Sequence, residues 1–187
     1  PADRKEQVSR NVTALEKVQP EDLTPGEIGV RISANWIPID VYEQFMFELF
    51  GTSGYARERM QILHSKATNE WNITNKNSDS SNIRARTTYG TSRINAYHIL
   101  EQTLNQKDVR IFDKAVDENG DERRVLNKKE TAIAQDRQEL IKSKFAEWIW
   151  KDIDRRERLC KIYNETFNSI RPREYDGQHI RFSGMNP

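Results

Sequence analysis

The chain has 187 residues, enough for one domain with a sizeable core or for a domain with an appended helical unit. Its 30 basic and 29 acidic residues give a net charge of +1, which excludes a global attraction to nucleic acid or membranes and leaves only local basic patches. A single cysteine, Cys160, excludes a disulfide framework and a cysteine-rich zinc site, and no apolar run is long enough to span a membrane. We therefore expect a cytoplasmic protein without a membrane span.

Two helices are predicted before residue 33. Residues 4–18 place apolar side chains at spacings of four, three and three, which is typical of a helix with one narrow apolar stripe. The members of this stripe are Val8, Val12, Leu15 and Val18. Thr24 as N-cap, Pro25 at the first helical position and Glu27 three residues after the cap then predict a short helix to about Ile32.

A third helix is expected between two breaking residues. Pro38 disfavours helical geometry at the residue before it, so the short helix ends there and a new one begins. Gly51 is the expected stop of this helix after Phe50. The side chains expected to face inward are Val41, Phe45, Phe47 and Leu49.

From Arg59 the apolar period changes to two, and residues 59–73 predict a β-hairpin with a turn at 67–69. The alternating side chains are Met60, Ile62 and His64 on one strand and Trp71 and Ile73 on the other. Residues 74–82 are polar and turn-rich, which predicts a loop, and residues 83–87 are compatible with a further strand.

A helix is expected after that strand, capped near Thr91 or Ser92. A second hairpin follows, with strands at 109–116 and 122–126. Residues 118–121 contain the Asn-Gly pair that tight hairpin turns prefer.

The last third is predicted to be helical. Asn127 and Glu130 form a cap-like pair before an apolar face that continues to about residue 150, and Asp152 or Asp154 can cap a second helix at 155–170. So short a break favours an antiparallel helical hairpin, packed through side chains such as Phe145 and Phe167.

The predicted fold class is α+β: small antiparallel β-hairpins packed with helices, then a C-terminal antiparallel helical pair and an extended tail. We expect an N-terminal amphipathic linker helix at 1–22, an α+β domain at 23–126 and a helical hairpin at 127–170 packed on it. Residues 171–187 contain two glycines and scattered apolar side chains, so they are expected to form an extended connector.

Sequence motifs for catalysis are absent. The chain has no HExxH pair, no GxxxxGK[ST] phosphate loop and no GxGxxG, and His64, His98 and His179 lie far apart in the sequence. We therefore expect no cofactor and no metal. Asp113, Lys114 and Glu70 lie on predicted strands and leave a metal-dependent nuclease as a third hypothesis.

Three segments mix basic groups with aromatic, hydroxyl or amide neighbours: 55–66, 84–93 and 155–161. Each is also compatible with a solvated face that carries local ion pairs, but 84–93 contains no acidic residue. Arginines in this segment and backbone amides at a helix start after Gly90 are suited to phosphate. The predicted nucleic-acid-binding residues are Arg84, Arg86, Thr91, Ser92, Arg93, Arg57, Arg59 and Lys66.

The amino-acid sequences of three long segments, and their order along the chain, resemble a known family. They are "EIGVRISANWIPIDVYEQFMFELFGT", "YGTSRINAYHILEQTLNQKDVRIFDK" and the stretch from "VLNKKETAIAQ" to "RFSGMNP". From about Leu23 to Pro187 the chain resembles the region that precedes the Swi/Snf-like helicase motor in large DNA methyltransferase-helicase fusion proteins of phages, plasmids and integrative conjugative elements.

The resemblance implies a fragment of a larger enzyme, with flanking methyltransferase and helicase domains as partners. The methyltransferase NPPY-type tetrapeptide and the helicase phosphate loop and DExx box are absent, so no catalytic residue carries over. The expected function is a non-catalytic accessory module that engages DNA weakly, through its phosphates, and couples these domains. The alternative is a structural docking domain that never contacts DNA.

Overall fold

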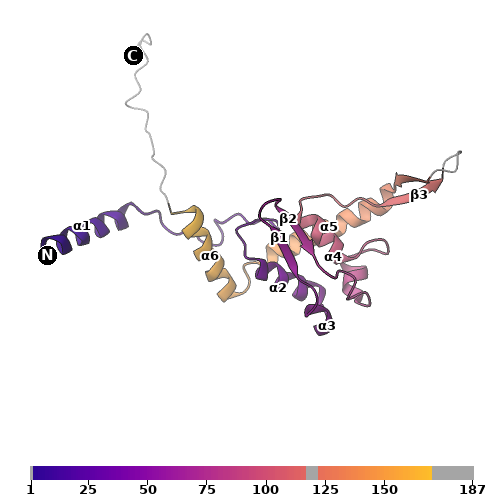
Figure 1. The fold of residues 1–187 in the computed structure, drawn as a ribbon, viewed down its shortest axis with the longest axis horizontal. Helices are drawn as coiled ribbons and strands as arrows, with labels where there is room; N and C mark the ends of the chain where they lie inside the picture. The colour runs from indigo at the N-terminus through magenta and orange to yellow at the C-terminus, as the bar shows by residue number, and fades with distance from the viewer. Residues whose placement is uncertain (1, 117–121, 170–187) are drawn as a thin grey trace, which may run out of the picture. The chain divides into compact units, whose positions relative to one another are not determined.

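The computed structural model describes residues 2–116 and 122–169. Its elements are α1 (Ala2–Val18), α2 (Ile39–Phe50), α3 (Gly54–Arg57), β1 (Ile62–Ser65), β2 (Glu70–Ile73), the π-helix η1 (Arg84–Thr88), α4 (Ala96–Leu104), β3 (Phe112–Val116), β4 (Glu122–Leu126), α5 (Lys128–Trp148) and α6 (Ile153–Phe167) (Figure 1). The chain divides into unit 1, formed by Pro1–Ile28 with Cys160–Pro187, and unit 2, Gly29–Leu159. The α+β class with two small antiparallel hairpins and C-terminal helices is confirmed.

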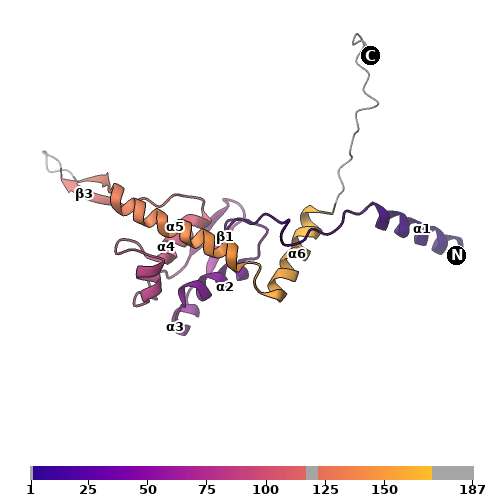
Figure 2. The same ribbon diagram turned by 180° about the vertical axis from the view of Figure 1, so that it is seen from behind.

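The core of unit 2 lies where α2, α4, α5 and the β1–β2 hairpin meet, and Figure 2 shows α5 running along this group of elements. Aromatic rings fill its centre. The Phe145 ring of α5 stacks on Tyr42 at a centroid distance of 5.5 Å and meets Phe45 edge-on at 5.0 Å. Tyr42 in turn contacts Trp71 of β2 at 5.1 Å, so one aromatic cluster joins two helices and a strand.

The helix expected up to Phe50 is confirmed as α2. Gly51 ends it with φ +61°, in the left-handed region that glycine adopts without strain. Of the four side chains expected inside, Val41 and Phe45 are buried, whereas Phe47 and Leu49 are half-buried at the edge of the core. The remaining buried side chains of α2 are Tyr42, Met46 and Phe50.

The two predicted hairpins are confirmed as separate two-stranded sheets. In the first, Ile62 pairs with Ile73 and Ser65 with Glu70, which places Ile62, Trp71 and Ile73 in the core. In the second, Phe112 pairs with Leu126, and every residue of β4 is exposed. This hairpin extends beyond the start of α5 in both Figures 1 and 2. The turn predicted at 118–121 lies outside the described residues.

The short helix expected after Thr24 is wrong, although its start signal forms. Glu27 Oε2 accepts hydrogen bonds from the backbone N–H and the hydroxyl of Thr24 at 2.8 and 2.7 Å. Both bonds lower the pKa of Glu27, and the bond from the hydroxyl has the larger effect. The turn does not propagate into a helix. Gly26 and Gly29 are poor helix formers, so the chain forms a single capped turn and no helix follows it.

Two predictions between the hairpins are also wrong. Residues 83–87 do not form a strand but enter η1, where Tyr89 N–H donates to Arg84 O. The next helix does not begin at Thr91 or Ser92. It begins at Ala96, because the Asn95 side chain accepts from the His98 N–H at 2.9 Å and caps it.

The cap-like pair before α5 is confirmed, since Asn127 Oδ1 accepts from the Glu130 N–H at 3.0 Å. The two phenylalanines expected to be buried in these helices differ in exposure. Phe145 is enclosed by aromatic rings of α2, whereas Phe167 is 55% exposed and contacts Tyr163 of its own helix. Asp152 caps the first turn of α6 by accepting from the Arg155 N–H at 2.8 Å.

Arg155 fastens the start of α6 to the end of α5. Its guanidinium donates to the backbone oxygens of Ile149 and Trp148 at 3.0 and 2.8 Å and lies 3.5 Å from the Trp148 ring centre. Burial lowers the pKa of this arginine. Trp148 itself packs against the core.

Unit 1 contains an asparagine clasp, which we define as Asn164 and Asn168 of α6 and its C-terminal flank with the backbone of residues 21–23. Leu23 N–H donates to Asn164 Oδ1 at 2.8 Å, and the Asn164 amide returns a bond to Leu23 O at 3.1 Å. Asn168 donates to Glu21 O at 2.8 Å. The predicted helix of residues 4–18 is confirmed as α1, and its Val8, Val12 and Leu15 are exposed.

In the described residues, no helix has the length and apolar character needed to cross a membrane. The predicted extended connector at 171–187 lies outside the described residues.

Candidate nucleic-acid interface

A buried carboxylate organises the region that carries the predicted arginines. Asp79, 5% exposed, accepts hydrogen bonds from the Ser53 hydroxyl at 2.8 Å, the Asn82 amide at 2.7 Å and the Tyr97 hydroxyl at 2.8 Å. Asn82 also donates to Phe50 O at 3.0 Å. The loop before η1 is thereby fixed to the junction between α2 and α3.

The pKa of Asp79 is lowered by this environment. Burial alone raises it, because the charged form loses hydration, but the hydrogen bonds from Asn82, Tyr97 and Ser53 stabilise the carboxylate and outweigh that effect. Burial also raises the pKa of Tyr97, so its hydroxyl keeps its proton and donates to Asp79. The network is therefore a charged acceptor surrounded by neutral donors.

Gly90 allows η1 to close against the start of the next segment. A β-carbon at this position would overlap Ala85 O and lie 3.0 Å from the backbone atoms Ile94 O and Ala96 N. All three neighbours are backbone atoms, so none can rotate away. The sequence can thus form the wide π-turn at 84–88 only with glycine at this position.

Arg84 and Arg86 project from η1, and both are exposed. In the part of the chain that the structure describes, neither side chain forms an ion pair or a hydrogen bond. The Arg84 side chain passes over Gly51, its Nη1 lying 3.4 Å from the position of a β-carbon there. The end of α2 therefore supports Arg84 without neutralising it.

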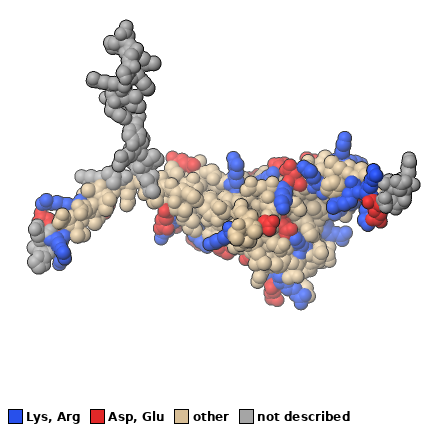
Figure 3. All heavy atoms as spheres, turned by 45° about the horizontal axis from the view of Figure 1, so that its top comes forward, with Lys and Arg blue, Asp and Glu red and all other residues tan. Residues whose placement is uncertain are grey.

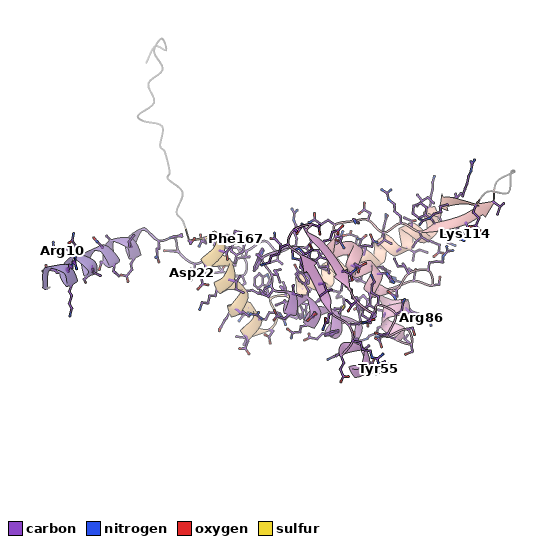
Figure 4. All side chains as sticks on the ribbon, in the orientation of Figure 1. Arg10, Asp22, Tyr55, Arg86, Lys114 and Phe167 are labelled. Atoms are coloured by element: carbon purple, nitrogen blue, oxygen red, sulfur yellow. The ribbon has the colours of Figure 1, made fainter. Side chains whose placement is uncertain are left out.

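A third cation belongs to the neighbouring α3 segment. The Arg59 guanidinium lies 4.1 Å from the ring centre of Tyr55, and this tyrosine is 60% exposed. Because α3 begins at Gly54, next to the Ser53 that binds Asp79, the same network holds α3 and η1 together. We call the residues Tyr55, Arg59, Arg84 and Arg86 the α3–η1 edge; Figure 4 labels Tyr55 and Arg86.

Arg57, a predicted phosphate ligand, contacts the backbone that follows α2. Its Nε donates to Thr52 O at 2.9 Å, and its guanidinium lies 5.6 Å from the Phe47 ring centre. A cation at this place also meets the negative end of the α2 dipole. The prediction for Arg57 missed this local acceptor, which lies only five residues away.

Arg93 is neutralised by an acid from a distant part of the sequence. Its guanidinium forms an ion pair with Asp113 Oδ1 at 2.7 Å and donates to Phe112 O at 3.1 Å. Hydrogen bonds from Asn127 and Arg93 lower the pKa of Asp113. Arg93 therefore differs from Arg84 and Arg86 in having an acidic partner.

The amide donors expected after Gly90 are occupied. Thr91 Oγ1 accepts from the N–H groups of Arg93 and Ile94 at 3.1 and 3.2 Å, so no helix N-terminus is open at Thr91 and Ser92. Ser92 is exposed in this turn. Lys66 is exposed in the β1–β2 turn, and the length of β1 separates it from α3.

The residues considered for catalysis are not gathered into one site. Asp113 and Lys114 lie on β3 and Glu70 on β2, two separate sheets, and Lys114 pairs with Glu122 at 2.9 Å. His64 stacks on Trp71 at 4.0 Å. Within residues 2–116 and 122–169, no group of three or more His, Cys, Asp or Glu side chains is placed to hold a metal ion.

A family model described as a domain of unknown function, DUF8437, matches residues 31–169. The chain belongs to the DUF8437 family. The match covers the aromatic core, the Asp79 network and the α3–η1 edge, so the DUF8437 region contains the candidate interface. No curated protein and no solved structure matches the chain.

Charge on the DUF8437 region is mixed. On the face that Figure 3 shows, basic and acidic side chains alternate over much of unit 2, and basic side chains gather toward the β3–β4 hairpin. Glu58, exposed and next to Arg59, adds an acid near the α3–η1 edge. The edge is therefore a local basic site and not part of a uniform positive face.

Proposed function

We propose that the chain is a non-catalytic DNA-engaging module of a larger DNA methyltransferase-helicase, and that the α3–η1 edge contacts the phosphate backbone. The main support for this proposal is the pair Arg84 and Arg86 on η1. Both guanidinium groups are exposed, and neither has an acidic partner among the described residues. Guanidinium groups bind phosphate through paired N–H donors. The resemblance of the sequence to the region before a Swi/Snf-like helicase motor supports the larger context.

Physical properties of this edge define the expected binding. Three cations, Arg59, Arg84 and Arg86, contact few phosphates, and nothing in the edge provides a set of donors aimed at base edges. Binding is therefore weak and independent of sequence, with dissociation constants of about 10⁻⁴ to 10⁻⁶ M at physiological salt. Coupling of the flanking domains would use this contact to place DNA between the two enzymatic parts.

The test is a fluorescence anisotropy titration with labelled duplex and single strand at two salt concentrations. Arg84→Ala/Arg86→Ala should weaken binding and flatten the log-log salt slope by about 1.5, because two phosphate contacts are removed. The matched control is Arg4→Ala/Lys5→Ala on α1, which removes the same charge from an exposed helix. Equal affinities of the parent and the Arg84/Arg86 variant would refute this interface.

The non-catalytic part of the proposal has its own measurement. Since the sequence contains no phosphate loop, the isolated chain is expected to hydrolyse no ATP and to bind no S-adenosylmethionine. ATPase activity that co-purifies with the chain, and that is lost when the chain is depleted from the sample, would contradict the accessory role.

One observation favours a docking domain as the second candidate function. Val8, Val12 and Leu15 of α1 are 60%, 47% and 61% exposed, so an apolar stripe faces solvent on a helix that is otherwise polar. An unpaired stripe of this kind is typical of a helix that packs against another protein surface. Loss of partner binding on Val12→Asp, with DNA affinity unchanged, would support docking.

A further inference from the structure

Unit 2 contains a groove that none of the predicted site residues line. It consists of three adjoining hollows of about 480, 390 and 500 Å³. The first two share Arg31 and Gln106 in their walls, and the second and third share Lys107 and Asp108. We call this the 31–124 groove, after Arg31 in the first hollow and Arg124 in the third.

Charge in the groove departs from the balance of the whole chain. Its walls contain the cations Arg31, Lys107, Arg110, Arg124 and Lys142 and the single acid Asp108. The whole sequence, in contrast, has 30 basic and 29 acidic residues. Cations concentrated along a concave, low-dielectric surface focus a positive potential there.

Most of these cations are available to a ligand. Across the described residues, the side chains of Arg31, Lys107 and Arg110 form no ion pair or hydrogen bond, and all three are exposed. Lys142 pairs with Glu139 at 2.7 Å, an exposed contact one turn away on α5 that water screens strongly. Asp108 therefore neutralises at most one of the three available cations.

The third hollow has a surface suited to a flat group. Ile32 and Phe145 also line the middle hollow, but they are 7% and 1% exposed, so they close its floor and present almost no free face. In the third, Phe112 contributes a ring over which the Arg124 guanidinium lies at 4.7 Å. Arginine and aromatic faces of this kind accept stacked bases.

The backbone on one side of the groove is rigid. Residues 107–111 run alongside α5, where Gln138 accepts from Val109 N–H at 3.2 Å and donates to Lys107 O at 2.8 Å. Two residues after Val109, the Ile111 N–H donates to the Thr131 hydroxyl oxygen of α5 at 3.0 Å. Lys107 and Arg110 thus project from a segment that helix side chains hold in place.

We propose that the 31–124 groove binds a single strand of nucleic acid, with phosphates on Arg31, Lys107 and Arg110 and a base stacked at the Arg124–Phe112 pair. Volumes of a few hundred Å³ are those of small-ligand sites, so each hollow admits a nucleotide but not a duplex. A repeating anion with flat groups matches both the spaced cations and the stacking surface at Arg124 and Phe112. This site is separate from the α3–η1 edge and does not depend on DNA binding there.

The experiment measures binding of the full chain to a labelled oligothymidylate of about 15 nucleotides, to the corresponding duplex and to polyglutamate. The groove variant is Arg31→Gln/Lys107→Gln/Arg110→Gln. Its control is Arg4→Gln/Lys5→Gln/Lys151→Gln, three exposed cations outside the groove. Each variant lowers the net charge of +1 by three, to −2, so a general charge effect is equal in both.

The groove variant should bind the single strand roughly tenfold or more weakly at low salt and flatten its salt slope by about 2, while the control binds like the parent chain. Equal single-strand affinities of groove and control variants overturn the inference. Polyglutamate that binds more tightly than the oligonucleotide, and loses affinity in the groove variant, would also overturn it and assign the groove to an acidic protein segment.

Arg84→Gln/Arg86→Gln, measured in parallel, separates this inference from the proposed function. If only the groove variant loses single-strand binding, the groove is supported and the α3–η1 edge is not. Loss in the edge variant alone would leave the proposed function standing and refute the groove. All substituted side chains are exposed, so unchanged thermal melting by circular dichroism should accompany each variant.

Discussion

Replacing Phe145 by alanine should destabilise unit 2 far more than the same change at Phe167. Phe145 is 1% exposed and packs against Tyr42 and Phe45, so its removal leaves a cavity that α2 and α5 can close only in part. The expected loss is about 3 to 5 kcal/mol, the usual cost of truncating a buried phenylalanine. Phe167 is 55% exposed and its ring contacts Tyr163 at the surface of α6, so its loss should cost less than about 1 kcal/mol.

Urea unfolding followed by tryptophan fluorescence provides the measurement, because Trp71 and Trp148 lie in and beside the aromatic core. With a slope of roughly 2 kcal/mol per molar urea, a loss of about 4 kcal/mol lowers the midpoint by about 2 M. The Phe167 variant should lower it by less than about 0.5 M. Similar urea midpoints for the two variants would refute the conclusion that Phe145 lies in the core while Phe167 does not.

Two further predictions concern the network that supports the α3–η1 edge. Asp79→Asn should cost about 1 to 3 kcal/mol near neutral pH, because an amide nitrogen would replace one acceptor among three donors. The pKa of Asp79 is lower in the folded state than in the unfolded state, where it is about 3.9. The stability that the carboxylate contributes is therefore complete above the unfolded pKa and is lost as the pH falls through the folded pKa. A difference in unfolding free energy between parent and variant that stays constant down to acid unfolding would contradict this. Gly90→Ala should lose at least about 2 kcal/mol in the same urea assay, because its β-carbon meets backbone atoms, whereas the control Gly54→Ala, with open space around it, should change stability by less than about 0.5 kcal/mol.

Features that depend on neighbours in sequence were predictable. The cap of α5 at Asn127, the stop of α2 at Gly51 and both hairpins follow from local patterns, and the structure confirms them. Thr24 shows the limit of such signals, because its capping bonds form but the glycines that follow do not sustain a helix. A start signal indicates where a helix can begin, while its continuation depends on the residues after it.

The candidate site was less predictable, because distant residues decide which cations are available. Segment 84–93 contains no acid, yet Asp113 neutralises Arg93 from β3. The polar loop at 74–82 gave no indication that Asp79 would be buried and hydrogen-bonded to Ser53 and Tyr97. The cations of the 31–124 groove come from four separate parts of the sequence, so no local basic segment indicated it.

The asparagine clasp of unit 1 has a mechanical consequence. Asn164 and Asn168 bind the backbone at Leu23 and Glu21, so the chain leaves toward unit 2 and returns at nearly one point. Tension applied between residue 21 and residue 168 would therefore load these few hydrogen bonds first. Until these hydrogen bonds break, they carry the applied force, so the clasp protects the inserted unit, Gly29–Leu159, from mechanical unfolding.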